Sequence, residues 1–397
     1  MSRPRIRIMA MGLAAVLTAT TACSTNSNGG GNGGSSGANS GSSGSAAAPA
    51  SQSAAGGSSA AAGNALQGDI SFNDANLAAL RDKIKAALKG KSLSGVNPAV
   101  VVNVTAAYWD AAKKGVENAN KELGINAKFQ EPTQMDISQQ LSIVNTLLSQ
   151  NTTGFSVSAI QPSSLSSFIS SASKKNVPVI AIDSPLDTFK SVPLYLGTPN
   201  YDAGHKAGEA LKQLLPGGGD VAVLVGSLTA LNAVQRIQGF KDALKGSNVK
   251  VFQVYNDGGD ANKALQNASA AYQADSNLKA FYGVYSYDGP SAGQAVQSAG
   301  KTGKTVVVAD DSEPKTLSFL KAGVIQAMVL QQPYQQGYMS VYILAAMKVL
   351  GEQATMNIIK PYLSSDKLTL SSGVGLVTQS NLAAYDQKLA SFGLSSS

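Results

Sequence analysis

The chain has 397 residues, a formal net charge of +7 and one cysteine, Cys23. A single cysteine excludes a disulfide within one chain, and the basic residues are too scattered to form a nucleic-acid-binding patch. The length leaves about 300 residues for folded structure, which indicates two domains of ordinary size.

The first 22 residues have the pattern of a secretory signal peptide. Arg3, Arg5 and Arg7 precede an apolar stretch over residues 8–17, and small residues then lead to Ala22. The apolar stretch is too short for a spanning helix, which needs about 20 apolar residues. We therefore predict a signal peptide over residues 1–22. Its removal lowers the net charge from +7 to +4, because three arginines leave with it.

Cys23 directly follows the predicted cleavage point. Small residues before a cysteine resemble the bacterial lipobox, in which that cysteine is lipidated, although Thr20 stands where an aliphatic residue is usual. Residues 24–63 are mainly Gly, Ser, Ala and Asn, a composition typical of a flexible tether. We predict that residues 23–63 anchor the protein to a membrane through Cys23 and hold the body outside the cytoplasm. A secreted protein with an incidental thiol is the alternative.

A short amphipathic helix leads into the folded body. Leu77, Leu80, Ile84 and Leu88 recur at helical spacing. We treat residues 64–97 as an N-terminal helical extension, which either packs on the first domain or continues the tether.

From residue 99 onward, apolar runs alternate with amphipathic helical patterns. Asp136 and Gln139 resemble a capping box at the start of one helix, and a second series of elements begins with a helix after Gly204. Strands that are apolar on both faces and separated by helices indicate parallel sheets covered on both sides. We predict an α/β fold with two doubly wound parallel-sheet domains. The predicted strands cover residues 99–104, 125–129, 154–160, 177–183, 221–226, 249–255, 278–286 and 304–311.

Polar and aromatic residues follow several of these strands, where ligands bind in open parallel sheets. Taken singly, each residue more often has a structural role than a binding role. A strand-end Asp more often caps a turn, an aromatic pair more often packs in the core, and a helical Arg more often lies on a solvent-exposed face. Together, carboxylates and a guanidinium bond vicinal hydroxyls in pairs, and aromatic rings pack on the C–H face of a sugar. The set therefore favours a sugar ligand. Its members are Tyr108, Trp109, Asp183, Arg236, Asp310, Asp311 and Gln331.

A metal site has little support in the sequence. The chain has one histidine, no thiolate beyond Cys23, and an acidic cluster at Asp310, Asp311 and Glu313 without another readable ligand group. We predict no metal and no cofactor.

Residues 99–394 resemble the ribose-type periplasmic sugar-binding proteins of ABC importers, whose type I fold has a LacI-like core. The resemblance covers essentially the whole folded body and rests on several segments in order rather than on one diagnostic motif. These segments are "YWDAAKKG", "NVPVIAID", "YLGTPNYDAGHKAGEAL", "VQRIQGF", "GPSAGQAVQSAGK", "VVVADDSEP", "LQQPYQQGY" and "GVGLVTQSNL".

The resemblance implies a ligand site between the two domains. Its aromatic stacking pair falls on Tyr108 and Trp109, and its second-domain asparagine falls in "VYSYDGP", where Tyr285 and Asp288 are both candidates. The expected ligand-binding residues are Tyr108, Trp109, Asp183, Thr198, Arg236, Tyr285, Asp288, Asp311 and Gln331.

Three departures from the family pattern bear on the ligand. An asparagine before the aromatic pair is replaced by Ala106, and an arginine after the first carboxylate is replaced by Ser184. The second-domain stacking aromatic is replaced by Gly258 or Gly259. We therefore expect a ligand other than ribose and a roomier pocket.

The resemblance also implies a three-segment hinge. The chain is expected to cross between domains near Thr198, Gln332 and Leu363. This gives a first domain of residues 98–198 plus 332–362, and a second of residues 199–331 plus 363–397.

The function implied is that of a monomeric, non-enzymatic lipoprotein that binds a monosaccharide or polyol and delivers it to a permease with its ATPase subunit. A sensor that feeds a kinase and a binder of a non-sugar molecule stay open as alternatives. A LacI-type regulator would need a DNA-reading helix-turn-helix at its N-terminus, where this chain has a signal and a low-complexity tract. A glycoside hydrolase is disfavoured because no catalytic Glu pair has readable spacing.

Overall fold

The computed structural model describes residues 66–186 and 192–395. The signal peptide predicted at residues 1–22, the lipidation predicted at Cys23 and the tether predicted to continue to residue 63 lie outside the described residues. Among the residues that are described, no helix is long and apolar enough to cross a membrane.

The first sheet contains six strands in the order β11-β5-β4-β3-β1-β2, and each neighbouring pair is parallel. Its strands are short and fully buried in the middle of the sheet, as expected for apolar runs covered on both faces. They are β1 (Ala99–Val101), β2 (Lys128–Gln130), β3 (Phe155–Val157), β4 (Val179–Ile182), β5 (Tyr195–Gly197) and β11 (Thr369–Ser371).

The second sheet repeats this pattern in the order β12-β10-β9-β8-β6-β7. Its pairs are parallel except for β12, which runs antiparallel to β10 at the sheet edge. The predicted α/β fold with two parallel-dominated sheets is therefore confirmed. The strands are β6 (Gly219–Val225), β7 (Val249–Asn256), β8 (Leu278–Gly283), β9 (Val306–Asp310), β10 (Ala327–Leu330) and β12 (Gly375–Val377).

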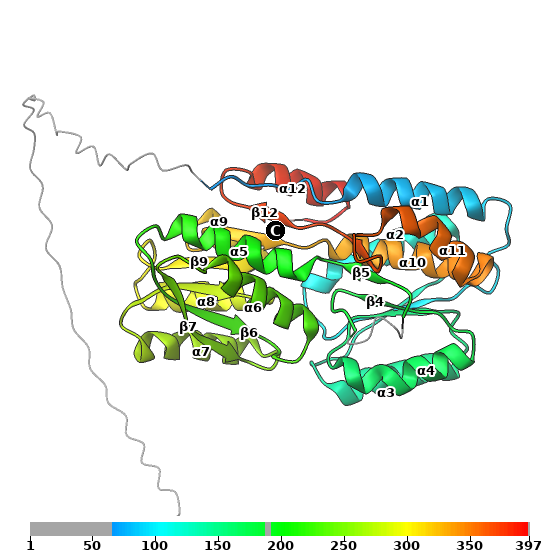
Figure 1. Ribbon diagram of the computed structural model, residues 1–397, viewed down its shortest axis with the longest axis horizontal. Helices are drawn as coiled ribbons and strands as arrows, with labels where there is room; N and C mark the ends of the chain where they lie inside the picture. Colours follow the sequence, from blue (N-terminus) through cyan, green and yellow to red (C-terminus); the bar gives the residue numbers. More distant parts are fainter. Residues whose placement is uncertain (1–65, 187–191, 396–397) are drawn as a thin grey trace, which may run out of the picture. The chain divides into compact units, whose positions relative to one another are not determined.

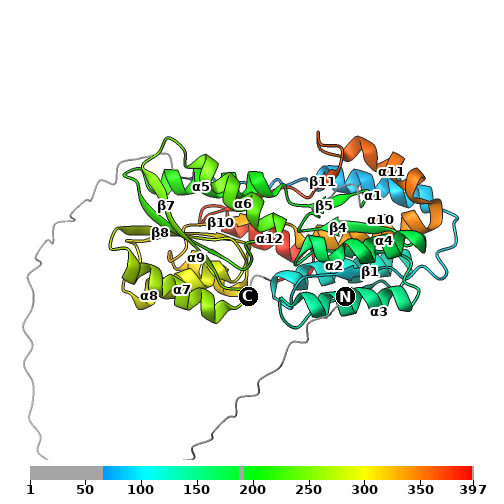
Figure 2. The same cartoon turned by 60° about the horizontal axis from the view of Figure 1, so that its bottom comes forward.

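Helices cover both faces of the first sheet, because alternate strand residues point to opposite sides. Val100 and Val102 share a core with one set of helices, and Ala99 and Val101 with the other. Figures 1 and 2 show the two sets on opposite faces. The first set is α1 (Asp74–Leu88), α2 (Tyr108–Leu123), α10 (Pro333–Leu350) and α11 (Glu352–Ile359), with η2 (Lys360–Tyr362); the second is η1 (Pro162–Leu165), α3 (Ile137–Ser149) and α4 (Ser166–Lys174).

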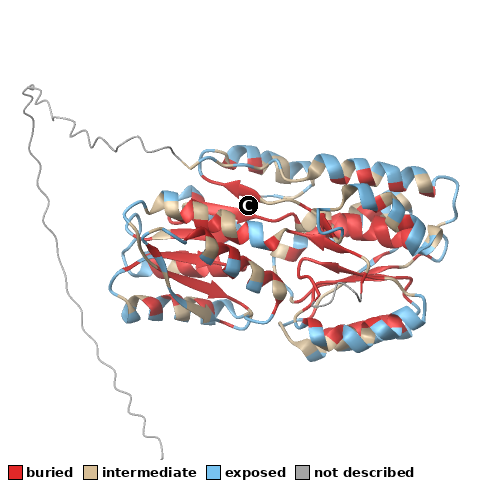
Figure 3. Ribbon diagram, in the orientation of Figure 1, coloured by how far each residue is buried: buried red, intermediate tan, exposed pale blue. Residues whose placement is uncertain are grey.

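The second sheet is covered in the same way. Val221 and Val223 pack with one pair of helices, and Ala222 and Leu224 with the helices of the opposite face. Figure 3 shows the buried strands between helices whose outer sides are exposed. The first pair is α5 (Asn200–Leu214) and α6 (Leu231–Ala243); the opposite face carries α7 (Ala261–Ala274), α8 (Asp288–Ser298), α9 (Pro314–Lys321) and α12 (Leu382–Ser391). We call each sheet with its helices a lobe.

The chain passes between the two sheets three times. It leaves the first sheet after β5, returns after β10, and leaves again between β11 and β12. The third passage corrects the expected crossing near Leu363, because Thr369–Ser371 still pairs with β5 in the first sheet. Sequence reasoning missed this strand because Leu370 is the one apolar residue among its three.

Helix α5 begins at Asn200 rather than after Gly204. Gly204 is a contact residue and not a helix boundary, because a Cβ there would overlap the carbonyl oxygen of Arg236 on α6. A Cβ at Gly239 would likewise overlap the carbonyl oxygen of Tyr201. These glycines bring α5 and α6 into close contact and so fix the position of Arg236.

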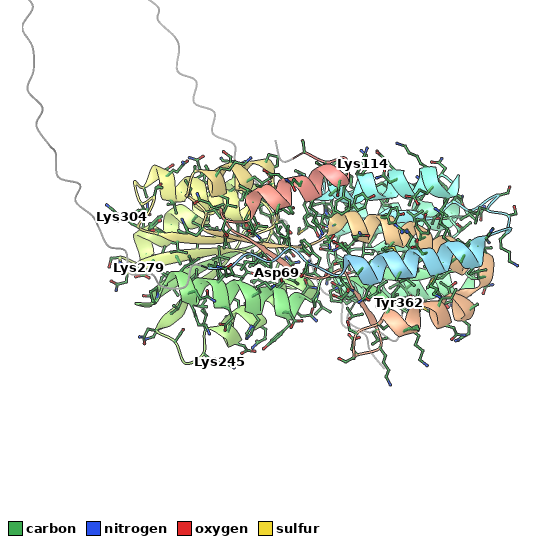
Figure 4. The ribbon with its side chains drawn as sticks, turned by 90° about the horizontal axis from the view of Figure 1, so that it is seen from above. Asp69, Lys114, Lys245, Lys279, Lys304 and Tyr362 are labelled. Atoms are coloured by element: carbon green, nitrogen blue, oxygen red, sulfur yellow. The ribbon has the colours of Figure 1, made fainter. Side chains whose placement is uncertain are left out.

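The N-terminal extension packs on the folded body. The backbone of Asp69, labelled in Figure 4, exchanges hydrogen bonds of 2.7 and 2.6 Å with Leu376 of β12, in the second lobe. Helix α1 buries Leu80 and Ile84 in the core of the first lobe. Residues 66–88 therefore contact both lobes.

At the start of α3, the Asp136 side chain accepts hydrogen bonds from the backbone of Ser138 and Gln139, as an N-cap does. The reciprocal half of the capping box does not form, because the Gln139 side chain accepts from Thr133 instead.

Candidate ligand-binding site

Arg236 is the most deeply buried cation of the site, with 1% of its surface exposed. Its Nη1 donates to Asp310 Oδ2 at 3.0 Å and to the Val284 carbonyl at 3.1 Å, and its Nε donates to Asn200 Oδ1 at 3.0 Å. Burial opposes its charge, but the nearby carboxylates, Asp310 first, raise the pKa of Arg236 above its ordinary value. Its Nη2 has no hydrogen-bond partner among the described residues.

Asp183 and Asp311 occupy equivalent positions in the two lobes. Each directly follows a central strand, β4 or β9, and each has a left-handed backbone, with φ values of 55° and 66°. This conformation is uncommon for a residue other than glycine and costs of the order of 1 kcal/mol. The same strained backbone conformation therefore directs one carboxylate from each sheet toward the junction between the two lobes.

The Asp183 carboxylate joins groups from both lobes. Its Oδ2 accepts from Ser158 Oγ at 2.7 Å and from Asn232 Nδ2 of the second lobe at 3.2 Å, and its Oδ1 accepts from Tyr108 Oη at 3.3 Å. Burial raises the pKa of Asp183, although the Arg236 charge and these hydrogen bonds oppose the change.

The Asp311 carboxylate has only neutral hydrogen-bond donors among the described residues. Gln331 Nε2 donates to its two oxygens at 3.2 and 3.1 Å, and Thr198 Oγ1 in turn donates to Gln331 Oε1 at 2.8 Å. Burial raises the pKa of Asp311 to about 8, against the attraction of Arg236. Burial likewise raises the pKa of Asp310, to about 7.

These groups surround a cavity of about 40 Å³, which we call the inner cavity. Seven of the nine expected binding residues line it. They are Tyr108, Trp109, Asp183, Arg236, Tyr285, Asp311 and Gln331.

The aromatic residues form its walls. The rings of Tyr108 and Trp109 meet edge to face at 4.7 Å between centroids, and Tyr285 donates through its hydroxyl to Asn232 Oδ1 at 3.2 Å. Trp109 also packs in the core of the first lobe, with 2% of its surface exposed.

Two expected residues do not line the inner cavity. Asp288 accepts from the backbone N–H of Tyr285 at 2.9 Å at the start of α8, where burial and the neighbouring Asp257 raise its pKa. It is therefore a buried turn residue. Thr198 lies behind Gln331 and orients its amide, so it acts through Gln331.

The sequence analysis missed six lining residues and named a seventh, Ala106, only as a departure from the family pattern. The six are Asn103, Val104, Met135, Asn232, Ser286 and Tyr287. Asn103 lies two residues after β1 and accepts from Trp109 Nε1 at 3.0 Å. Met135 lies against Gly259, where the expected aromatic is absent, so a side chain of the first lobe fills that space. Asn103 and Tyr287 lie at strand ends, a signal that could have been used; Met135 in its loop gave none.

No group of three or more His, Cys, Asp or Glu side chains in the described part of the chain is arranged to hold a metal ion. The site instead combines two acceptor carboxylates, a guanidinium with a free donor edge, amides and aromatic rings. Such a set can bond neighbouring hydroxyls from both sides while packing on an apolar ring face.

The chain is similar to known binding proteins in sequence and structure. Residues 98–353 match the periplasmic binding protein domain. The D-allose-binding periplasmic protein of Escherichia coli is 29% identical over 58% of this chain and 77% of its own length. The ribose import binding protein of Bacillus subtilis is 26% identical over 57% of this chain and 72% of its own length.

A solute-binding protein of an ABC transporter from Burkholderia graminis, solved in complex with D-arabinose, superposes with a TM-score of 0.67 at 29% identity. The match covers 74% of this chain and 99% of the other. The resemblance to the ribose-type proteins is thereby confirmed, and the chain belongs to the periplasmic binding protein family.

Proposed function

We propose that this protein is the substrate-binding component of an ABC importer and that it holds a monosaccharide or related polyol between its two lobes. The family and the sugars named for its relatives support this proposal. So does the inner cavity, whose polar groups suit hydroxyls better than a metal or an apolar ligand.

One observation carries the proposal: the inner cavity combines two buried carboxylates without a charged partner of their own and one guanidinium with a free Nη2. Buried polar groups are almost always paired, so an unpaired donor beside acceptor oxygens points to a ligand that both donates and accepts. Sugar hydroxyls do both.

The hinge is connected to the same groups. Gln331 donates to Asp311, and Thr198 donates to Gln331. One of the three connecting segments therefore contacts a cavity carboxylate directly, and a second contacts it through Gln331. A sugar bonded to Asp311 and Asp183 would join the two lobes and favour their closed arrangement. A permease that recognises this arrangement would then receive the loaded protein.

A thermal-shift screen of the chain from residue 24 onward tests the proposal. The panel contains pentoses, hexoses, deoxysugars and polyols, each added to protein freed of any co-purified ligand. A sugar at 100 times its dissociation constant adds about 2.7 kcal/mol, which raises the Tm of a folded body of this size by about 4 °C. If folded protein shows no shift with any member, the sugar-binding role is wrong.

We further propose that Cys23 carries the lipid anchor outside the cytoplasm and that the protein acts as a monomer without catalysis or a cofactor. Membrane fractionation of Cys23→Ser cells tests the anchor. Release of the variant from the membrane fraction supports it, whereas unchanged fractionation contradicts it.

A further inference from the structure

A second, larger cavity lies directly beside the inner cavity. It encloses about 310 Å³, and we call it the outer chamber. The two share three lining residues, Tyr108, Asp311 and Gln331. A ligand bonded to Asp311 therefore has the outer chamber beside it.

The volumes of the two spaces differ in a way that bears on the ligand. The inner cavity, at about 40 Å³, is far below the usual range of ligand pockets, about 300–1,000 Å³, whereas the outer chamber lies at the lower end of that range. Lobe movement would enlarge the inner cavity for a first ring. The outer chamber already has the volume for a second.

The outer chamber has the surface that a sugar ring needs. The rings of Tyr334 and Phe392 stack at 4.3 Å between centroids with planes 13° apart, and Tyr334 also stacks on Tyr338, so the outer face of Phe392 is the aromatic wall of the chamber. Glu313, which follows β9 in the second lobe and is partly buried, accepts from Ser286 Oγ at 2.6 Å, and burial raises its pKa. An aromatic face suits the C–H face of a pyranose, and a carboxylate suits its hydroxyls.

Part of this wall comes from segments outside the matched family domain, which ends at residue 353 and begins at residue 98. Phe72 precedes α1, and Lys388 and Phe392 belong to α12 and its end. Lys388 pairs with Asp74, and its Nζ lies 4.7 Å from the centroid of the Phe72 ring, so the two terminal segments close the chamber together. Figure 4 shows α1 and α12 on the same face of the body.

We infer that the cargo is a glycoside of at least two units, with one sugar in the inner cavity and a second ring in the outer chamber. The inference rests on the proposed function and narrows it to a substrate class. Asp311 and Gln331 lie at the boundary between the two spaces, so Asp311 would accept from a hydroxyl beside the linkage between the rings.

Titration calorimetry on the chain from residue 24 onward tests this inference. Each monosaccharide of the panel is compared with its methyl glycoside and with disaccharides that contain it. We expect at least one disaccharide to bind about tenfold more tightly than its parent sugar, as an added aromatic contact provides. If every disaccharide binds more weakly than the free sugar, the inference is overturned and the proposed function stands. If no sugar binds, both this inference and the proposed function are wrong.

Two variants test whether the tighter binding of a disaccharide comes from the outer chamber. Phe392→Ala removes the ring of the aromatic wall, and Ala111→Phe fills the chamber from α2. Neither changes a residue of the inner cavity. Each should remove the tenfold preference and leave monosaccharide affinity within about twofold. Phe252→Ala, at an exposed ring on β7, is the matched control and should change neither. A preference that survives both chamber variants overturns the assignment.

Discussion

Replacing Asp311 with Asn should separate ligand binding from stability. Asp311 has no hydrogen bond to a cation in the structure and is held by the Gln331 amide. The change turns one acceptor oxygen into a donor, so a charge-assisted bond to a ligand hydroxyl is lost. Such bonds contribute about 1.5–3 kcal/mol, which corresponds to a roughly 10- to 150-fold weaker affinity.

The stability of the same variant follows from the pKa. Burial raises the pKa of Asp311 from 3.8 to about 8, so between these values the folded protein holds a proton that the unfolded chain releases. Stability therefore falls as the pH rises from about 4 to 8, by up to about 1.4 kcal/mol per pH unit for this group. Asn does not titrate, so the variant should lose less stability over this range than the wild type.

Melting curves at pH 5 and pH 8, with calorimetric titration of a sugar from the panel at pH 8, measure both effects. We expect a smaller fall in Tm for Asp311→Asn and a clearly weaker affinity. A variant that melts well below the wild type at pH 8 would show that the carboxylate supports the fold. Wild-type affinity in the variant would show that the ligand does not contact Asp311.

Further predictions concern the groups around Asp311. Arg236→Ala should destabilise the protein by about 3–5 kcal/mol because Asp310 loses its buried partner, and a melting curve near that of the wild type would contradict this role. Gly204→Ala should lower the free energy of unfolding by about 1–3 kcal/mol or more, because the added methyl overlaps the α6 backbone. Gly90→Ala is the control: its added methyl has open space, so this variant measures only the strain of a backbone φ of 75°. For the wild type, sugar affinity should rise between pH 6 and pH 8 as Asp311 becomes ionised, and a flat pH profile by calorimetry would argue against it as an acceptor.

The central strands and their faces could be predicted from the sequence because buried parallel strands are continuous apolar runs. The strands β5, β11 and β12 could not, because none of them lies in an apolar run as long as Ala99–Val102, which contains the equally short β1. The antiparallel pairing of β12 depends on contacts with β10 that lie far away in the sequence.

The candidate site shows a similar division. Strand-end position indicated that Asp183, Asp310 and Asp311 belong at the junction of the two lobes, and the family resemblance selected Asp311 rather than Asp310. Neighbouring residues at a strand end point to opposite sides, and in the structure Asp310 accepts from Arg236 while Asp311 lines the cavity. Asp288 begins the helix that follows a strand, but its carboxylate accepts from the backbone N–H of Tyr285 and does not line the cavity.

A crystal structure of the protein with the sugar that gives the largest thermal shift would show directly whether the sugar binds between the lobes. We expect one sugar ring there, with hydroxyls bonded to the carboxylates of Asp183 and Asp311 and an oxygen at Nη2 of Arg236. A sugar bound elsewhere on the protein, or one in the cavity that leaves all three groups without contact, would contradict it.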